Sequence, residues 1–390
     1  MILLSHPTGN ANVRAIAEAL LRHDLLFRFA TCLALSNSSR RSFNIPREKL
    51  WTRPVRESVR HLASRLRFNA LVEHERGWAS IDAVGHDLDR FVARRVAANS
   101  DSALRGVYCY EDFALTTFET ANARRLKCVY DLPIAYWETS QRLLREQAIR
   151  WPAWEPTLIA TRDSSEKLAR KRRELELSDT VVTPSRFVMD SLPEEIRATK
   201  QCIVAEFGSP NVAETVRPAH ERLRLLFAGA MTQRKGLADL FAAMKLLNST
   251  AVELVVMGSP LMPMSFYREQ FADFIYEPPR EPKRVFDLMR TCDVLVLPSI
   301  VEGRALVQQE AMACGLPLIV TSNAGGEDLI DNGRTGFLVP TNSPESIAST
   351  IEWFITHPGE LPAMSAAAHA KAATLTWRDY GDKVVHAIAA

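Results

Sequence analysis

The sequence predicts an α/β protein made of two doubly wound, Rossmann-like domains. Short apolar runs alternate with helical patterns along the whole chain, which is typical of parallel sheets covered by helices. The length of 390 residues suits two to three domains. Only four of the 16 glycines precede residue 200, whereas nine lie from Gly229 to Gly336. Because glycine lets the backbone approach a ligand closely, we expect the chemistry in the second half.

The N-terminal half opens with a buried-strand pattern at 2–5, followed by a turn at 6–10. Apolar residues then recur at the spacing of an amphipathic helix, at Val13, Ile16, Ala17, Leu20 and Leu21. Three later apolar runs predict strands between helices, at 106–110, 126–130 and 180–184.

The C-terminal half repeats this order more clearly. Its expected strands are 223–228, 252–257, 294–297 and 318–321, and its clearest helices are 237–247 and 305–313. The candidate linker is 208–222, which contains Pro210 and Pro218. The expected domains are 1–208, 209–375 and a terminal segment at 376–390.

Composition excludes several classes of protein. With 47% hydrophobic and 24% charged residues, the chain is neither disordered nor a coiled coil. Its apolar runs fall far short of the ~20 residues that span a bilayer, and no secretory signal is visible. The six cysteines lack zinc-ligand spacing, so we expect reduced thiols, a cytoplasmic location and no metal site. The net charge of +2 gives no reason to expect a nucleic-acid partner.

Segment 40–67 is strongly basic, with nine Arg or Lys residues against two Glu. Phe43, Trp51 and Phe68 lie among or beside these charges. Such a surface suits peripheral contact with an anionic membrane or a phosphorylated lipid acceptor. An ordinary solvated, arginine-rich helical face fits the pattern equally well.

The strongest chemical signal is the run 298–317, in which Glu302 and Glu310 lie eight residues apart across a strand–loop–helix junction. If the stretch were helical, the spacing would be ~12 Å along the axis. A carboxylate accepts hydrogen bonds from two vicinal hydroxyls at once. One carboxylate on a hexose and one on a ribose would hold a nucleotide sugar at both ends.

A second signal follows the strand at 223–228, where Gly229 is followed by Arg234 and Lys235 before a helix. Backbone N–H groups and two cations at one place neutralise a diphosphate. Because a departing diphosphate gains charge in the transition state, these cations would also assist its departure.

These segments resemble the retaining GT-B glycosyltransferases of family 4, the glycosyl transferases group 1. The resemblance is close from 223 to 340 and weak over the first half. It implies the GT-B fold, in which two Rossmann-like domains face a central cleft and the final helix, from Trp377, packs back on the first domain. It further implies that Glu302 contacts the transferred sugar and Glu310 the ribose, and that Arg234 and Lys235 bind the diphosphate. The donor-binding residues expected on this basis are Gly9, Asn10, Gly229, Arg234, Lys235, Gly258, Tyr276, Glu302, Gly303, Arg304, Ala305, Leu306 and Glu310.

Three positions depart from the family pattern. Ala230 stands where many members have an arginine, Gly9-Asn10 replaces a double glycine, and no histidine follows the strands at 106–110 and 126–130. Glu111, Asp112 or Asp131 could serve the acceptor hydroxyl instead, or could simply cap a turn. The retaining reaction needs no dedicated base if the departing phosphate takes the proton. His6 is expected to have a structural role. The Asp87-Leu-Asp89 run is expected to lie on a solvated helix face.

The sequence therefore predicts a retaining hexosyltransferase that moves a sugar from a nucleotide-diphosphate donor to a hydroxyl of a glycan or lipid-linked acceptor. Exopolysaccharide, capsule or lipopolysaccharide synthesis in bacteria, at the inner membrane face, is the expected setting. No cofactor beyond the donor and no metal is expected. The alternatives are a non-catalytic glycosyltransferase-like binding subunit and another GT-B enzyme such as a sugar epimerase.

Overall fold

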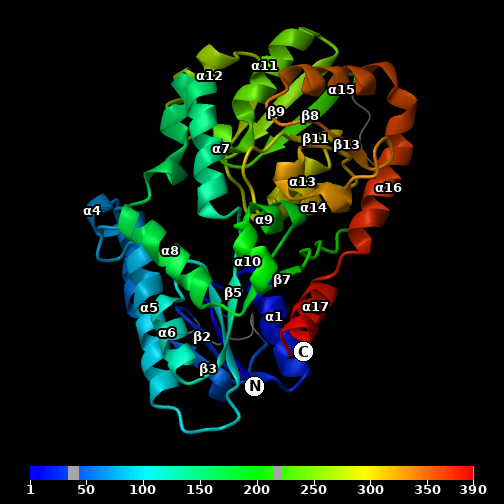
Figure 1. Cartoon of the computed structure of the whole chain (residues 1–390). Coiled ribbons are helices and arrows are strands. Elements are labelled where there is room, and N and C mark those ends of the chain that lie inside the picture. The colour runs from blue at the N-terminus through cyan, green and yellow to red at the C-terminus, as the bar shows by residue number, and fades with distance from the viewer. Residues whose placement is uncertain (34–43, 214–220, 390) are drawn as a thin grey trace.

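Two parallel sheets with flanking helices confirm the predicted two-domain α/β architecture (Figure 1). The computed structural model describes residues 1–33, 44–213 and 221–389. The strands expected from the sequence are all present, with ends within one residue of those expected. The expected helix at 305–313 begins one residue later, at Leu306.

The N-terminal sheet has seven parallel strands in the order β3-β2-β1-β4-β5-β6-β7. They are β1 (Ile2–Ser5), β2 (Leu26–Thr31), β3 (Leu50–Thr52), β4 (Gly106–Tyr110), β5 (Lys127–Asp131), β6 (Thr180–Thr183) and β7 (Gln201–Val204). The helices of this half are α1 (Ala11–Arg22), α3 (Val55–Arg65), α4 (Asn69–Val72), α5 (Ile81–Ala97), α6 (Leu115–Ala123), α7 (Trp137–Arg150), α8 (Ser165–Leu177), α9 (Arg186–Ser191) and α10 (Glu194–Thr199). The short 3-10 turns are η1 (Arg47–Lys49), η2 (Pro152–Thr157) and η3 (Ile159–Arg162). The strand order reverses between β1 and β4, and ligands of such sheets bind at that reversal. The family resemblance also implies that the segment 181–187 holds the last strand of the first domain, and this expectation is wrong, because β7 pairs with β6 beyond it.

The C-terminal sheet has six parallel strands in the order β10-β9-β8-β11-β12-β13. They are β8 (Leu223–Ala228), β9 (Val252–Met257), β10 (Ile275–Glu277), β11 (Val294–Leu297), β12 (Leu318–Val320) and β13 (Gly336–Leu338). Its helices are α11 (Leu237–Leu247), α12 (Met264–Gln270), α13 (Pro282–Met289), α14 (Leu306–Ala313), α15 (Pro344–Thr356) and α16 (Leu361–Ala373). The short turns are η4 (Gln233–Lys235), η5 (Ser322–Ala324), η6 (Glu327–Leu329) and η7 (Pro358–Glu360). Here the order reverses between β8 and β11, so the loops after these two strands meet.

The apolar runs become strands because helices cover both faces of each sheet. All four residues of β11 are buried, as are those of β1 and β6. Strands that are buried on both faces show continuous apolar runs rather than alternation. This is why the sequence reveals the central strands clearly.

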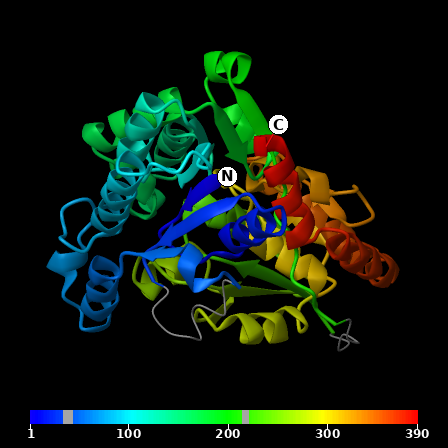
Figure 2. The same cartoon turned by 90° about the horizontal axis from the view of Figure 1, so that it is seen from below.

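Two helical segments cross between the domains. The last helix, α17 (Trp377–Ala389), packs against α1 of the first sheet, and Figures 1 and 2 show the two side by side. The contact is close, because a Cβ on Gly381 would lie 2.5 Å from the carbonyl oxygen of Ala15. In the other direction, the chain after α7 inserts Trp154 into the core of the C-terminal domain, where it is 1% exposed.

Candidate functional site

Three of the expected site residues meet where the loops after β8 and β11 come together. One carboxylate oxygen of Glu302 lies 2.8 Å from Nη1 of Arg234 and 2.5 Å from Nζ of Lys235. Arg234 also donates to the carbonyl oxygen of Val301 at 2.8 Å. Burial alone would raise the pKa of Glu302, but Lys235 and Arg234 outweigh it and hold that pKa below its usual range. The result is a charged carboxylate held by two cations.

The glycines of this region let the backbone pack closely. Gly229 has a φ of +147°, and a Cβ there would lie 2.7 Å from the Lys235 side chain. A Cβ on Gly258 would lie 1.7 Å from the carbonyl oxygen of Gly229. The Tyr276 hydroxyl donates to the carbonyl oxygen of Gly258 at 3.2 Å. Three strand ends, those of β8, β9 and β10, therefore converge beside Lys235.

The two glutamates of the strongest motif differ in their surroundings. The helix α14 begins at Leu306, after Ala305, so the chain between Glu302 and Ala305 is not helical and the ~12 Å helical spacing does not describe the pair. Glu310 is half-buried on α14, and burial raises its pKa. Within the part of the chain that the structure describes, no hydrogen bond to its carboxylate is found.

The loop between these glutamates touches the N-terminal domain. The Ser185 hydroxyl donates to the carbonyl oxygen of Gly303 at 2.6 Å. A Cβ on Gly303 would lie 1.7 Å from the carbonyl oxygen of Pro133. Glu302 thus sits at the boundary of the two domains.

Arg304 is engaged by the protein itself. Its guanidinium binds Asp328 through two nitrogens, at 2.6 and 2.9 Å, and donates to the carbonyl oxygen of Gly325 at 3.1 Å. Its third nitrogen donates to Gln309 at 3.2 Å. The side chain is 0% exposed. Arg304 therefore fixes the 325–328 loop next to Glu302.

The loop after β1 begins helix α1. Asn10 precedes the first turn of α1, and its side chain makes no capping hydrogen bond. The first N–H groups of a helix form an anion site. His6 is buried at the same strand end, and burial lowers its pKa to about 4. Its Nδ1 accepts from the Thr8 N–H at 3.1 Å, while its ring lies edge-on to Tyr110.

The acids after β4 are held by lysines of α8. Glu111 lies 3.4 Å from Lys171, and Asp112 lies 3.5 Å from Lys171 and 3.7 Å from Lys167. Burial raises the pKa of Glu111 to about 7, against the opposing effect of Lys171. Glu174 accepts from the Asp112 N–H at 2.8 Å. These contacts favour a structural part for both acids.

Asp131, at the end of β5, has no cationic partner among the ion pairs of the described residues. Burial raises its pKa to about 7, while the Tyr108 hydroxyl beside it acts in the opposite direction. One of its carboxylate oxygens is buried without a hydrogen-bond partner in the described residues. One oxygen of Glu111 and one of Asp112 are in the same state, so Asp131 differs from these two acids in having no lysine partner among the described residues.

The Asp87-Leu-Asp89 run is only partly solvated. Asp89 is 1% exposed and accepts from the N–H groups of Thr116 and Thr117 at 2.9 and 2.8 Å. The expectation of a solvated face is therefore wrong for Asp89, because it caps the start of α6. Asp87 instead pairs with Arg53 at 2.9 Å.

The basic segment 40–67 is partly neutralised from within. Residues 40–43 lie outside the described residues. Arg53 and Arg56 lie 2.9 and 4.0 Å from Asp87, and Arg60 lies 2.6 Å from Glu57. The exposed apolar side chains of α3, α4 and the chain between them are Val55, Leu62, Leu66, Phe68 and Leu71. Among the described residues, no helix is long and apolar enough to cross a membrane.

One possible cation site exists in the described residues, formed by His74, Glu75 and Asp163. The Lys167 ammonium already lies 3.5 Å from Asp163, and the Ser164 N–H donates to Glu75 at 2.9 Å. The atoms that would bind a cation at this site therefore already interact with other protein groups.

Sequence reasoning missed Gln233, which holds the Arg234-Lys235 turn in place. Its side-chain nitrogen donates to Asp239 at 2.6 Å and to Gln147 of α7 at 2.9 Å, and its oxygen accepts from the Ala238 N–H. Only its position directly before Arg234 could have drawn attention to it.

Comparison with known proteins finds a family model that is similar to part of the second half of the chain. Residues 222–357 match the model described as glycosyl transferases group 1. The chain is 35% identical over 105 residues to a D-inositol 3-phosphate glycosyltransferase of Rhodococcus jostii. The aligned residues are 27% of this chain and 23% of the relative. A relative with the same name plus the number 1, from Catenulispora acidiphila, is 28% identical over 213 residues, which is 50% of this chain and 51% of the relative. The chain thus aligns with between about a quarter and a half of these relatives.

Solved structures match over the whole length. The sucrose-phosphate synthase of Thermosynechococcus elongatus superposes with a TM-score of 0.69 at 17% identity, covering 99% of this chain and 97% of that one. HepE of Anabaena in complex with UDP-glucose gives 0.62 at 16% identity, covering 100% and 99%. At these identities the match establishes the two-domain fold.

Proposed function

We propose that the chain belongs, through its C-terminal domain, to the family described as glycosyl transferases group 1, whose model matches residues 222–357. On this premise it transfers a sugar from a nucleotide-diphosphate donor to a hydroxyl acceptor, with retention at the anomeric carbon. The observation that carries the proposal is the Glu302 carboxylate held between Arg234 and Lys235 at the domain boundary. Few structural roles require two cations and one buried acid at the meeting point of strand-end loops.

The donor would exchange places with Glu302 as the partner of the two cations. A diphosphate carries more negative charge than one carboxylate, so Arg234 and Lys235 would turn to it. Glu302 would then be free to accept hydrogen bonds from sugar hydroxyls. The N–H groups at the start of α1 would meet the phosphates from the other domain.

In the reaction, the bond between the anomeric carbon and the phosphate oxygen breaks and a bond to the acceptor oxygen forms on the same face. The acceptor's proton passes to the departing phosphate oxygen, so no side chain needs to remove it. Negative charge grows on the diphosphate as it leaves, and Arg234 and Lys235 stabilise that charge. These two cations supply the positive charge that a divalent ion would otherwise bring, so we propose transfer without a metal.

The acceptor is proposed to be a glycan or lipid-linked hydroxyl, in bacterial exopolysaccharide, capsule or lipopolysaccharide synthesis at the cytoplasmic face of a membrane. The exposed apolar side chains of α3–α4, with Arg65 and Arg67 among them, fit the surface of an anionic bilayer. Because Arg53, Arg56 and Arg60 already have acidic partners, the apolar side chains would carry more of this contact than those arginines.

The membrane contact is tested by cosedimentation with vesicles that contain phosphatidylglycerol. Leu62→Glu with Phe68→Glu should remove binding. Ile149→Glu, which changes an exposed apolar residue on α7, is the matched control and should not. Equal binding of both variants would count against the α3–α4 surface.

The transfer itself is tested by incubating the protein with UDP-, GDP-, ADP- and CMP-linked sugars, with simple sugar acceptors, with and without EDTA. NMR of the product should show the anomeric configuration of the donor, and Glu302→Gln should yield none. Interconversion of donor sugars without transfer would support a sugar epimerase instead. Binding of a nucleotide sugar without any turnover would support a non-catalytic binding subunit.

A further inference from the structure

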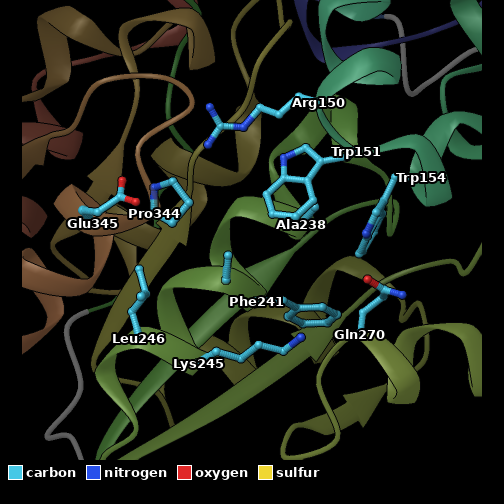
Figure 3. A pocket seen from close by; sticks show the side chains of 11 residues that line it. Arg150, Trp151, Trp154, Ala238, Phe241, Lys245, Leu246, Gln270, Pro344 and Glu345 are labelled. Atoms are coloured by element: carbon cyan, nitrogen blue, oxygen red, sulfur yellow. The ribbon is translucent and has the colours of Figure 1, made fainter.

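A second cavity lies away from the donor site, between the α7–η2 segment and helices α11 and α15 (Figure 3). Its volume is about 540 Å³, within the range of roughly 300–1,000 Å³ that is usual for small-molecule sites. Trp151, Trp154 and Phe241 line it. Trp151 is half-buried, whereas Trp154 and Phe241 are 1% and 2% exposed, so Trp151 supplies the accessible ring. We call it the aromatic pocket. None of the residues that meet around Glu302 takes part in it.

The walls of the aromatic pocket are fixed before any ligand arrives. Trp154 is 1% exposed and packs edge-on against Phe241, with ring centres 6.0 Å apart. Asp239, 1% exposed beneath the pocket, accepts from the Trp151 indole N–H at 3.4 Å and lies 3.3 Å from the Arg150 guanidinium. Because the site is pre-organised, a ligand would lose little binding energy to ordering it.

Polar groups of both signs surround the rings. Arg150, Lys245 and Gln270 can donate hydrogen bonds, and Glu345 and Gln270 can accept them. The indole N–H of Trp154 is buried and has no acceptor within the described residues.

This combination fits one class of ligand better than others. A sugar ring has a C–H face that packs on an aromatic ring, which Trp151 supplies here, and hydroxyls at its edge that both donate and accept hydrogen bonds. Cationic and acidic groups side by side do not favour a simple anion or cation. A purely apolar ligand would leave the polar rim without partners.

We propose that the aromatic pocket binds a saccharide of one or two rings, at a site separate from the donor cleft. If the proposed transferase function holds, this site would bind a part of the acceptor glycan that is distant from the reacting hydroxyl. The binding itself is a property of the pocket and does not depend on turnover.

Saturation-transfer NMR on the full chain tests the proposal, with maltose, cellobiose, N-acetylglucosamine and glucuronic acid as probes. At least one probe should bind saturably, and Trp151→Ala and Gln270→Ala should each weaken that binding at least tenfold. Lys235→Ala should leave it unchanged, as should an excess of the nucleotide that fills the cleft. Trp78→Ala, which removes an exposed tryptophan of the other domain, is the matched control.

Three results would overturn the proposal. Failure of all four saccharides to bind is the first, and binding that survives both pocket substitutions is the second. The third is Trp151-dependent binding of uridine, adenosine or a detergent in preference to every saccharide. A separate titration with nucleotides on the same samples shows whether the donor site is intact, so failure of this inference is distinguishable from failure of the proposed function.

Discussion

Among single residues, Glu302 matters most to the proposed function, and it does so through its charge. Two cations within 2.8 Å keep this buried carboxylate ionised, and both form ion pairs with it. The proposed reaction requires the donor to displace it from those cations. Donor binding and catalysis should therefore respond differently when its charge is removed.

The substitution Glu302→Gln should lower kcat by at least 100-fold while leaving donor affinity unchanged or tighter. The amide no longer competes for Arg234 and Lys235, but it gives weaker hydrogen bonds to the sugar in the transition state. Calorimetric titration with the donor nucleotide, together with initial rates, measures both effects. A large loss of affinity with an unchanged kcat would contradict the exchange of partners.

The pKa of Asp131 predicts how stability depends on pH. Burial raises it from 3.8 to about 7 in the folded chain, so between pH 4 and pH 7 the native state binds more protons than the unfolded state. The free energy of unfolding should fall as pH rises through this window and then level off. The difference between the two pKa values corresponds to at most about 4 kcal/mol.

Asp131→Asn should lack that contribution. Its stability relative to the unsubstituted chain should therefore increase from pH 4 to pH 8, as measured by urea unfolding at each pH. Asp87→Asn, at a half-buried carboxylate paired with Arg53, is the control. A constant difference across the pH range would mean that Asp131 is charged in the folded protein.

At the scale of elements, the 325–328 loop is positioned by Arg304. Its two-nitrogen contact with Asp328 has a geometry that lysine does not reproduce. Arg304→Lys should raise the donor KM several-fold and lower the melting temperature by a few degrees. Arg334→Lys, at an exposed arginine of the same domain, is the control. Unchanged kinetics in Arg304→Lys would show that this loop has no part in the donor site.

The central strands could be predicted from the sequence, and several peripheral ones could not. Strands β1, β4 and β11 are buried along almost their whole length, and their sequences are mainly apolar runs. Strand β8 has the same character after Arg224. Strand β3 has only three residues, all half-buried, and β7 is an edge strand with no fully buried residue. Short edge strands have no apolar pattern of their own, because their neighbours in the sheet determine their position.

The candidate site was predictable where its residues belong to sequence motifs that directly follow strand ends. Arg234, Lys235 and Glu302 follow strand ends that meet by topology, so motif and fold together point to them. The bond from Ser185 to Gly303 joins residues 118 apart, and the lysines that engage Glu111 come from α8. Contacts of this kind form only in the folded protein, and no local sequence pattern predicts them.

At the scale of the whole molecule, the two domains meet at Gly303. A Cβ at this position would collide with the carbonyl oxygen of Pro133 in the other domain. Gly303→Ala should therefore push the domains apart while each domain stays folded. Small-angle scattering should show a larger radius of gyration and kcat should fall at least tenfold, with donor affinity altered less. Gly359→Ala, at an open position, is the control, and an unchanged scattering curve for Gly303→Ala would contradict the closed arrangement.

The central claim is that Arg234 and Lys235 form the diphosphate site of a nucleotide-sugar donor. Its most direct test is the thermal stability of the protein with UDP, GDP, ADP and CMP and their sugar conjugates, with and without magnesium, for the unsubstituted chain and Lys235→Ala. One nucleotide should stabilise the unsubstituted chain without magnesium, by roughly 2.7 kcal/mol at 100 times its Kd, and should lose most of this effect in Lys235→Ala. Stabilisation by none of them, or equal stabilisation of both proteins, would contradict the claim.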